Sequence, residues 1–225
     1  MTKLAITTCL TLICTFAVCT AAFAIDYKAE KLSEAPPKEV PAEIGKLLQP
    51  TGIKVIRGSS RTLCDIWLCK EWQVKSLKPQ GDVMYPFEPG QLIGVVRYGR
   101  RGSDFRDLDI SSGLYTLRYG QQPVDGNHVG TSPTRDFLLL LSTEMDKRSA
   151  TLDYEALTER SAEVTESTHP ALLSLQNVKL APKPPVIRNN DEHDWWILRL
   201  GSTAKAGKET GPVELDLVIV GQAAE

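Results

Sequence analysis

The sequence contains few of the residues and motifs that most often carry catalysis. It has three histidines, and no two of them share a short motif. It has no Gly-x-Ser-x-Gly elbow of a serine hydrolase, and nothing in it resembles a phosphate loop or a dinucleotide-binding turn. These absences argue against nucleotide-dependent enzymes. They do not exclude a catalytic triad assembled in space, because triads are recognised by geometry rather than by sequence position.

The chain also lacks a strong excess of either charge and lacks long apolar runs after its N-terminus. Its formal net charge is −2, which argues against partners such as nucleic acid or anionic membrane surfaces. No later stretch approaches the roughly 20 apolar residues that a membrane span needs. We therefore expect no membrane span once the N-terminal segment is removed.

The N-terminus has the three parts of a secretory signal peptide. A basic start at Lys3 is followed by an apolar run that ends in Ala22-Phe23-Ala24. Cys19 raises the question of a lipoprotein, but Val18 precedes it where a small residue is wanted. The sequence thus predicts a signal peptide over residues 1–24, cleavage after Ala24, and a secreted or periplasmic bacterial protein. Cleavage moves the formal charge from −2 to −3, because the segment holds one lysine and no acid.

Cysteine is scarce in the predicted mature chain. Three of the five cysteines lie in the signal segment, which leaves Cys64 and Cys69. A pair in an oxidising compartment suggests a disulfide. However, their spacing places them on opposite faces of one strand, about 16 Å apart if extended, whereas a bridge needs Cα atoms within about 7 Å. The sequence therefore favours two free, partly buried thiols, with a disulfide as the alternative.

The pattern of the remaining chain predicts a mainly β fold of the β-sandwich or jelly-roll type with one amphipathic helix. Residues 25–50 read as an extended lead-in with a short helix from Pro41 to about Leu48, or alternatively as a flexible linker. Residues 51–225 read as a single domain. Strands are expected at residues 53–57, 61–74, 91–98, 114–119, 137–141, 171–180, 194–200 and 213–220, a helix at 153–168, and loops at 183–194 and 201–212.

The central stretch GLYTLRYGQQPVDGNHVGTSPTRDFLLLL, from Gly113 to Leu141, holds the most polar loop of the chain. Its first strand alternates, and its last five residues are a continuous apolar run typical of a strand covered on both faces. The loop between them is long enough to suggest a function. The candidate ligand-binding residues are Asp125, Asn127, His128, Arg135 and Asp136. The alternative is an Ω-loop whose polar side chains bond their own backbone.

Metal and cofactor sites receive little support from the sequence. The loop acids and a second acidic group, Asp191, Glu192 and Asp194, could offer oxygen ligands to Ca²⁺. However, Asp125-Gly126-Asn127 does not continue as an EF-hand. We therefore predict no metal site and no cofactor, with a divalent cation in the loop as the alternative.

Two consecutive tryptophans, Trp195 and Trp196, lie in a predicted strand. Because successive residues of a strand point to opposite faces, one of them must face away from the core that the other fills. That residue is covered by the helix or the lead-in, or it is an exposed contact for a ligand.

Several of these motifs occur together in a known group. The DGNH…RDFLLL stretch, preceded by DIWL and LIGVVRY strands and followed by a helix ending in His-Pro, resembles an uncharacterised family of secreted bacterial proteins of acidobacterial and planctomycete type. The resemblance covers most of the chain from Pro50 to the last strand. It implies secretion, and no activity or ligand comes with it.

The sequence thus favours a non-enzymatic binding or accessory module of the cell envelope, with a small molecule, a glycan or an envelope protein as partner. A hydrolase, metal-assisted or not, that uses the Asp125–Asp136 loop is one alternative. A purely structural envelope protein is another.

Overall fold

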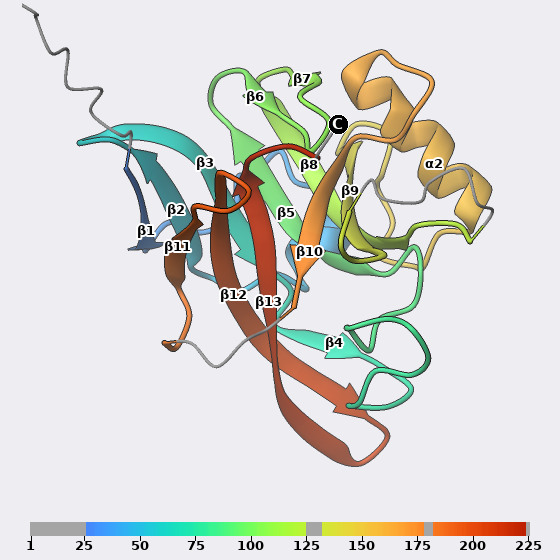
Figure 1. The fold of residues 1–225 in the computed structure, drawn as a ribbon. Coiled ribbons are helices and arrows are strands. Elements are labelled where there is room, and N and C mark those ends of the chain that lie inside the picture. Colours follow the sequence, from blue (N-terminus) through green and yellow to red (C-terminus); the bar gives the residue numbers. More distant parts are fainter. Residues whose placement is uncertain (1–25, 125–131, 178–181, 224–225) are drawn as a thin grey trace, which may run out of the picture.

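The protein has the mainly β fold that the sequence predicts (Figure 1). The computed structural model describes residues 26–124, 132–177 and 182–223. Its strands are β1 (Tyr27–Leu32), β2 (Gly52–Arg57), β3 (Arg61–Leu68), β4 (Glu71–Gln73), β5 (Leu92–Tyr98), β6 (Gly102–Ser103), β7 (Asp109–Ile110), β8 (Gly113–Gln121), β9 (Asp136–Ser142), β10 (Leu172–Gln176), β11 (Val186–Asn190), β12 (Trp195–Ala206) and β13 (Glu209–Val220). Its helices are α1 (Ala42–Gly45), α2 (Tyr154–Ala162) and the 3-10 turn η1 (Glu163–Thr165).

One curled sheet forms the body of the molecule. Its strand order is β1-β2-β3-β5-β8-β9-β10-β13-β12-β11, β4 pairs in parallel with β12, and β6 and β7 form a separate ribbon. The two ends of the sheet approach each other, as Figure 1 shows for β1 and β11. Across this junction the ring of Tyr27 lies 5.1 Å from the ring of Trp196. The two halves of the sheet consequently face each other around a core, as in a sandwich.

The main core lies inside the curl. Side chains at alternate positions point inward from both halves of the sheet, because the side-chain period of a strand is two. Each such leucine or isoleucine contributes about 1.5–3 kcal/mol on burial. The two halves contribute, among others, Ile66, Val96, Leu117, Leu138 and Leu140 on one side and Leu198, Leu200, Leu215 and Leu217 on the other.

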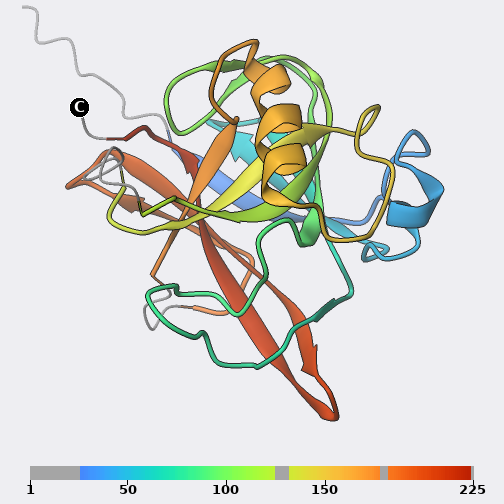
Figure 2. The same cartoon turned by 90° about the vertical axis from the view of Figure 1, so that its right-hand side faces the viewer.

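A second apolar cluster covers the outside of β9. Phe137, Leu139 and Leu141 point away from the main core and pack with Leu157 of α2 and with Trp195. Figure 2 shows α2 lying against this face of the sheet. Burial on both faces explains why β9 is a continuous apolar run. The two clusters confirm the predictions that this strand is covered on both sides and that the helix lies on the sheet.

Helix α2 begins where the sequence places a capping residue. Asp153 accepts a hydrogen bond from the backbone N–H of Ala156 at 2.8 Å, which satisfies one of the free donors of the first turn. Ser161 anchors the last turn by donating to the carbonyl of Ala171 at 2.9 Å. Over the described part of the chain, no helix combines the length and apolar character needed to traverse a bilayer.

A buried ion pair holds the segment that leads into α2. The Arg118 guanidinium contacts both carboxylate oxygens of Asp146, at 2.6 and 2.9 Å. Its remaining N–H groups donate to the backbone carbonyls of Gly90, Arg148 and Ala150. All five donors are thus satisfied, which a buried arginine requires. The network fixes the start of α2 relative to β8.

Two segments predicted as loops are strands, and those predictions are wrong. Residues 201–212 belong to the β12–β13 hairpin, whose turn contains Gly207 at φ +60°. The tip of this hairpin extends beyond the body of the molecule (Figure 2), and Ala204 is the one residue of 201–212 that is buried, so apolar alternation is absent. Residues 183–194 contain the edge strand β11, in which no residue is fully buried.

Two further segments differ in detail from the prediction. The strand expected at residues 61–74 is divided, because β3 ends at Leu68 and β4 begins at Glu71. The segment predicted as a lead-in supplies β1, which pairs along its whole length with β2. Its helix α1 lies within the predicted range of residues 41–48.

The tryptophan pair and the cysteines follow the sequence expectations. Trp195 packs in the second cluster, with its ring 5.3 Å from that of Phe105, whereas Trp196 packs on the other face against Tyr27. Cys64 and Cys69 are free and buried. Burial raises the pKa of both thiols, that of Cys69 to about 12, so both stay protonated and unreactive near neutral pH.

Candidate functional site

The loop predicted as the site is described only at its ends. Asp125, Asn127 and His128 lie outside the described residues, so their role stays a prediction. Arg135 donates to the backbone carbonyl of Gln122 from Nε at 3.1 Å and from Nη2 at 2.9 Å. These bonds join the two ends of the loop across its base. Arg135 therefore acts as a brace in the described structure.

Asp136 is fully buried at the start of β9. It accepts a hydrogen bond from the Tyr119 hydroxyl at 2.5 Å and from the backbone N–H of Met84 at 3.2 Å. Burial raises the pKa of the Asp136 carboxyl, and the hydrogen bond from Tyr119 opposes that rise. Burial also raises the pKa of Tyr119. The carboxylate thus faces the inside of the curled sheet, where it ties the segment around Met84 to β8 and β9.

The other candidate ligands are not brought together. Among the described residues, no group of three or more His, Cys, Asp or Glu side chains is placed to hold a metal ion. His169 hydrogen-bonds Thr168, whereas the His193 ring stacks on Trp195 at 4.4 Å. Asp191, Glu192 and Asp194 are exposed between β11 and β12.

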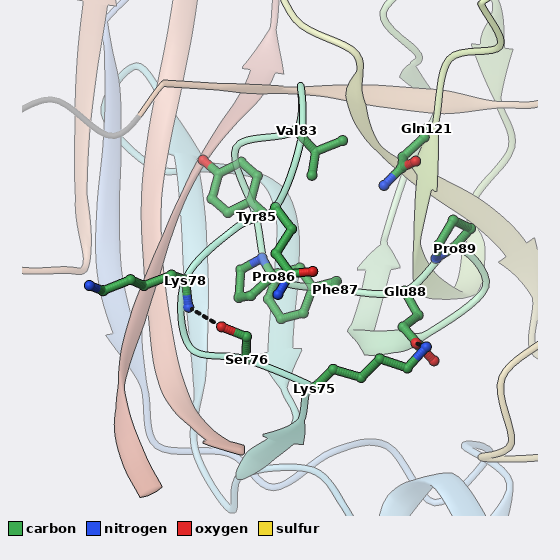
Figure 3. A pocket seen from close by; sticks show the side chains of 11 residues that line it. Lys75, Ser76, Lys78, Val83, Tyr85, Pro86, Phe87, Glu88, Pro89 and Gln121 are labelled. Carbon is green, nitrogen blue, oxygen red and sulfur yellow. Dashed lines mark hydrogen bonds and ion pairs between the residues drawn. The ribbon is translucent and has the colours of Figure 1, made fainter.

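A small pocket of about 230 Å³ lies in the loop between β4 and β5 (Figure 3). Most of its polar groups are used by the loop itself. Lys75 forms an ion pair with Glu88, and the Ser76 hydroxyl accepts from the backbone N–H of Lys78 at 3.1 Å. In Figure 3 the ammonium end of Lys78 points away from the pocket. These contacts shape the loop and leave little to bind a ligand.

A larger cavity of about 600 Å³ lies between α2 and the outer face of β9. Its position is set by two backbone hydrogen bonds. The N–H of Phe105 donates to the carbonyl of Leu172, and the N–H of Ala223 donates to the carbonyl of Phe105, each at 2.8 Å. The turn after β6, the start of β10 and the C-terminal segment therefore meet beside α2. The apolar lining is formed by Phe105, Phe137, Leu139, Leu157, Pro170 and Leu172.

The space stays open because few large side chains enter it. Gly120 of β8 lines the cavity, and a Cβ at this position would lie 2.2 Å from Cδ1 of Leu139. The glycine therefore lets Leu139 lie flat against the sheet. From α2, Leu157 is the one buried apolar side chain that reaches the cavity. Tyr154, 53% exposed, lies at the mouth.

Besides Tyr154, Thr158, Gln121 and Gln122, the polar side chains of the described lining are Arg106 and His169, which lie beside Pro170. Arg106 donates from Nη2 to the Pro170 carbonyl at 2.7 Å, while its buried Nε has no partner among the described residues. His169 is the neighbour of Pro170 in sequence and also lines the cavity. The lining that the structure describes contains no aspartate or glutamate. The cavity is thus apolar with a donor-rich end.

Sequence reasoning missed this cavity. Its walls come from six separate segments, and from the loop between the strands at 114–119 and 137–141 only Gly120, Gln121, Gln122 and Pro123 line it. The sequence signal that could have predicted the cavity was the continuous apolar run of β9 together with a helix that has few apolar residues. Such a helix cannot fill the face that it covers.

Comparisons with known protein families, with curated proteins and with solved structures gave no match for this chain. The resemblance to secreted bacterial proteins therefore stays a prediction, and the site rests on its geometry.

Proposed function

We propose that this protein is a non-enzymatic binding module that holds a small apolar molecule in the cavity between α2 and β9. The cavity itself carries the proposal. Its volume of about 600 Å³ lies within the 300–1,000 Å³ typical of ligand sites. Protein interiors are otherwise packed nearly as densely as organic crystals, so a space of this size is far larger than a packing defect.

The chemistry of the lining supports binding over catalysis. Nucleophilic catalysis needs a nucleophile within hydrogen-bond reach of a base. The side-chain hydroxyls that α2 brings to the described lining are those of Tyr154 and Thr158, and that of Thr158 donates to the helix carbonyls of Tyr154 and Glu155. His169 contacts Thr168, whose side chain lies outside the lining. The described lining thus pairs no nucleophile with a base.

We place this module at the cell envelope or outside the cell on the signal-peptide pattern of residues 1–24. N-terminal sequencing of protein recovered from the periplasm or the medium tests this part. The expected first residue is Ile25, and a retained Met1 would contradict it.

A structural role is the second candidate, because Arg135 and Asp136 act as braces at the ends of the 125–136 loop. A hydrolase that uses His128 stays a hypothesis from the sequence. The His128→Ala variant separates these two, since a brace affects the melting temperature whereas a catalytic residue affects turnover.

The binding function is tested by titration with the neutral fluorescent probe N-phenyl-1-naphthylamine. We expect saturable fluorescence enhancement with the wild-type protein. Thr158→Phe places a ring in the cavity, so it should weaken probe binding at least about tenfold, which corresponds to about 1.4 kcal/mol. Glu159→Phe is the matched control, because this neighbour on α2 is exposed and does not line the cavity. Equal binding by both variants and the wild-type protein would place the probe elsewhere and refute the proposal.

A further inference from the structure

We infer that the ligand of this cavity is an amphipathic monocarboxylate whose carboxylate binds Arg106 and whose apolar part fills the space under α2. The inference rests on the proposed function and specifies its ligand class. Three properties of the cavity carry it. They are the sign of its polar groups, the incomplete hydrogen bonding of Arg106, and the position of Arg106 at one end of an apolar space.

The polar groups of the described lining favour a ligand whose head group accepts hydrogen bonds. Arg106 is the one charged side chain in that lining, and the acid that pairs with Arg106, Asp104, lies outside the described lining. A ligand with a positive head would meet a guanidinium in an apolar surrounding and would be repelled. A neutral apolar ligand would leave the guanidinium donors unused. A carboxylate accepts charge-assisted hydrogen bonds from them.

Arg106 is held in place but incompletely bonded. Its one hydrogen bond from the side chain runs from Nη2 to the Pro170 carbonyl at 2.7 Å. The buried Nε has no partner among the described residues, and such a donor costs about 1–3 kcal/mol of desolvation when it stays unpaired. A guanidinium has five donors in a planar fork that matches a carboxylate.

Asp104 does not occupy the remaining hydrogen-bond donors of Arg106. Its carboxylate forms an ion pair with Arg106, with 3.6 Å between Oδ2 and Nη2, and this distance is too long for a hydrogen bond. Its Oδ1 instead accepts the backbone N–H groups of Arg106 at 2.8 Å and of Leu108 at 2.9 Å. Asp104 is buried and shapes the turn that presents Arg106. The guanidinium therefore keeps Nη1 for a ligand, whereas Nε is unpaired and buried.

The apolar part of the ligand follows from the rest of the lining. Arg106 and His169 meet at the Pro170 end, whereas Phe137 and Leu139 lie on the outer face of β9 under α2. A molecule with its head at Arg106 therefore extends its body over the strand. The apolar surface accepts an alkyl chain or an aromatic ring, and both belong to the same class of monocarboxylate.

The test compares ligands that share a chain and differ in the head group. Dodecanoate, dodecanol and dodecyltrimethylammonium, below their micellar concentrations, compete with N-phenyl-1-naphthylamine on the full chain, and 4-phenylbutyrate provides an aromatic acid. We expect dodecanoate to bind about tenfold or more tightly than dodecanol, because a charge-assisted bidentate contact exceeds a neutral hydrogen bond. The ammonium compound should bind most weakly.

Variants assign the preference to Arg106. Arg106→Gln should bring dodecanoate to the affinity of dodecanol, and Arg106→Lys should keep part of the preference because it keeps the charge without the planar fork. Arg101→Gln is the matched control, since Arg101 is exposed and pairs with Asp109 outside the cavity. Circular dichroism melts verify that each variant folds. If Arg106→Gln does not fold, Arg106→Lys provides the test.

The outcomes separate this inference from the proposed function. If the probe binds and Thr158→Phe blocks it, but dodecanoate and dodecanol bind equally, the binding function stands and the carboxylate inference fails. The inference also fails if Arg106→Gln retains the full preference for dodecanoate. If the probe does not bind to the wild-type protein at all, the proposed function itself fails.

Discussion

Asp136, which the sequence predicts as a ligand contact, stabilises the fold through its hydrogen bonds. Its side chain follows a polar loop in the sequence, but it points into the curled sheet and accepts hydrogen bonds from Tyr119 and from the backbone of Met84. Arg135, its neighbour, binds the carbonyl of Gln122 at the base of the same loop. Both side chains are therefore occupied by the protein itself.

The burial of Asp136 predicts a particular pH dependence of stability. Its pKa in the folded protein is raised above the ordinary value of 3.8. The folded state therefore binds the proton more tightly than the unfolded state. The protonated carboxyl contributes most to the free energy of unfolding below pH 3.8. This contribution is lost as the pH rises through the raised pKa of the folded protein. Above that value the dependence is flat.

Urea denaturation of the wild-type protein and of Asp136→Asn across this range measures the effect. We expect the stability of the wild-type protein relative to the variant to fall as the pH rises above 3.8 and then to level off. Glu209→Gln, an exposed acid at the tip of the β12–β13 hairpin, is the control. A relative stability that rises with pH over this window would show that the folded pKa is lowered instead.

At the scale of elements, α2 forms one wall of the cavity and depends on its cap. Asp153→Ala removes the bond to the Ala156 N–H and should lower the free energy of unfolding by about 1 kcal/mol. It should also weaken binding of the neutral probe, because Tyr154, Leu157 and Thr158 line the cavity. Urea denaturation and probe titration measure the two effects. Glu159→Ala, on the exposed side of the same helix, should change neither by a comparable amount.

At the scale of the whole molecule, the two ends of the sheet close on each other through aromatic packing. Tyr27 is 8% exposed and contacts Trp196 from the opposite end of the strand order. Tyr27→Ala should lower the free energy of unfolding by about 3 kcal/mol, as deletion of a buried aromatic ring does. Tyr154→Ala, which removes a tyrosine that is 53% exposed, is the control for denaturation. Equal stability of the two variants would mean that the closure contributes nothing.

The local pattern of the sequence determined much of the secondary structure. Alternation over residues 114–119 and the apolar run 137–141 predicted β8 and β9, and the pair Trp195 and Trp196 predicted rings on opposite faces of one strand. Burial of one face of a strand leaves a period of two in the sequence, and burial of both faces leaves a continuous apolar run. In the hairpin around Gly207 and in β11 few residues are buried, so neither pattern is present and the prediction failed.

Only the tertiary structure decided where the cavity lies and which charge faces it. The residues of the lining are far apart in the chain, among them Phe105, Arg106, Leu139, Leu157 and Pro170. They meet because the curled sheet brings β9 and β10 side by side and α2 crosses these strands. No local periodicity records such a meeting. The cavity also depends on Gly120, which has only a hydrogen atom as its side chain, and on α2, which has few apolar residues to fill the space. The class of fold therefore followed from the order of residues along each strand, whereas the cavity followed from contacts between strands and helix.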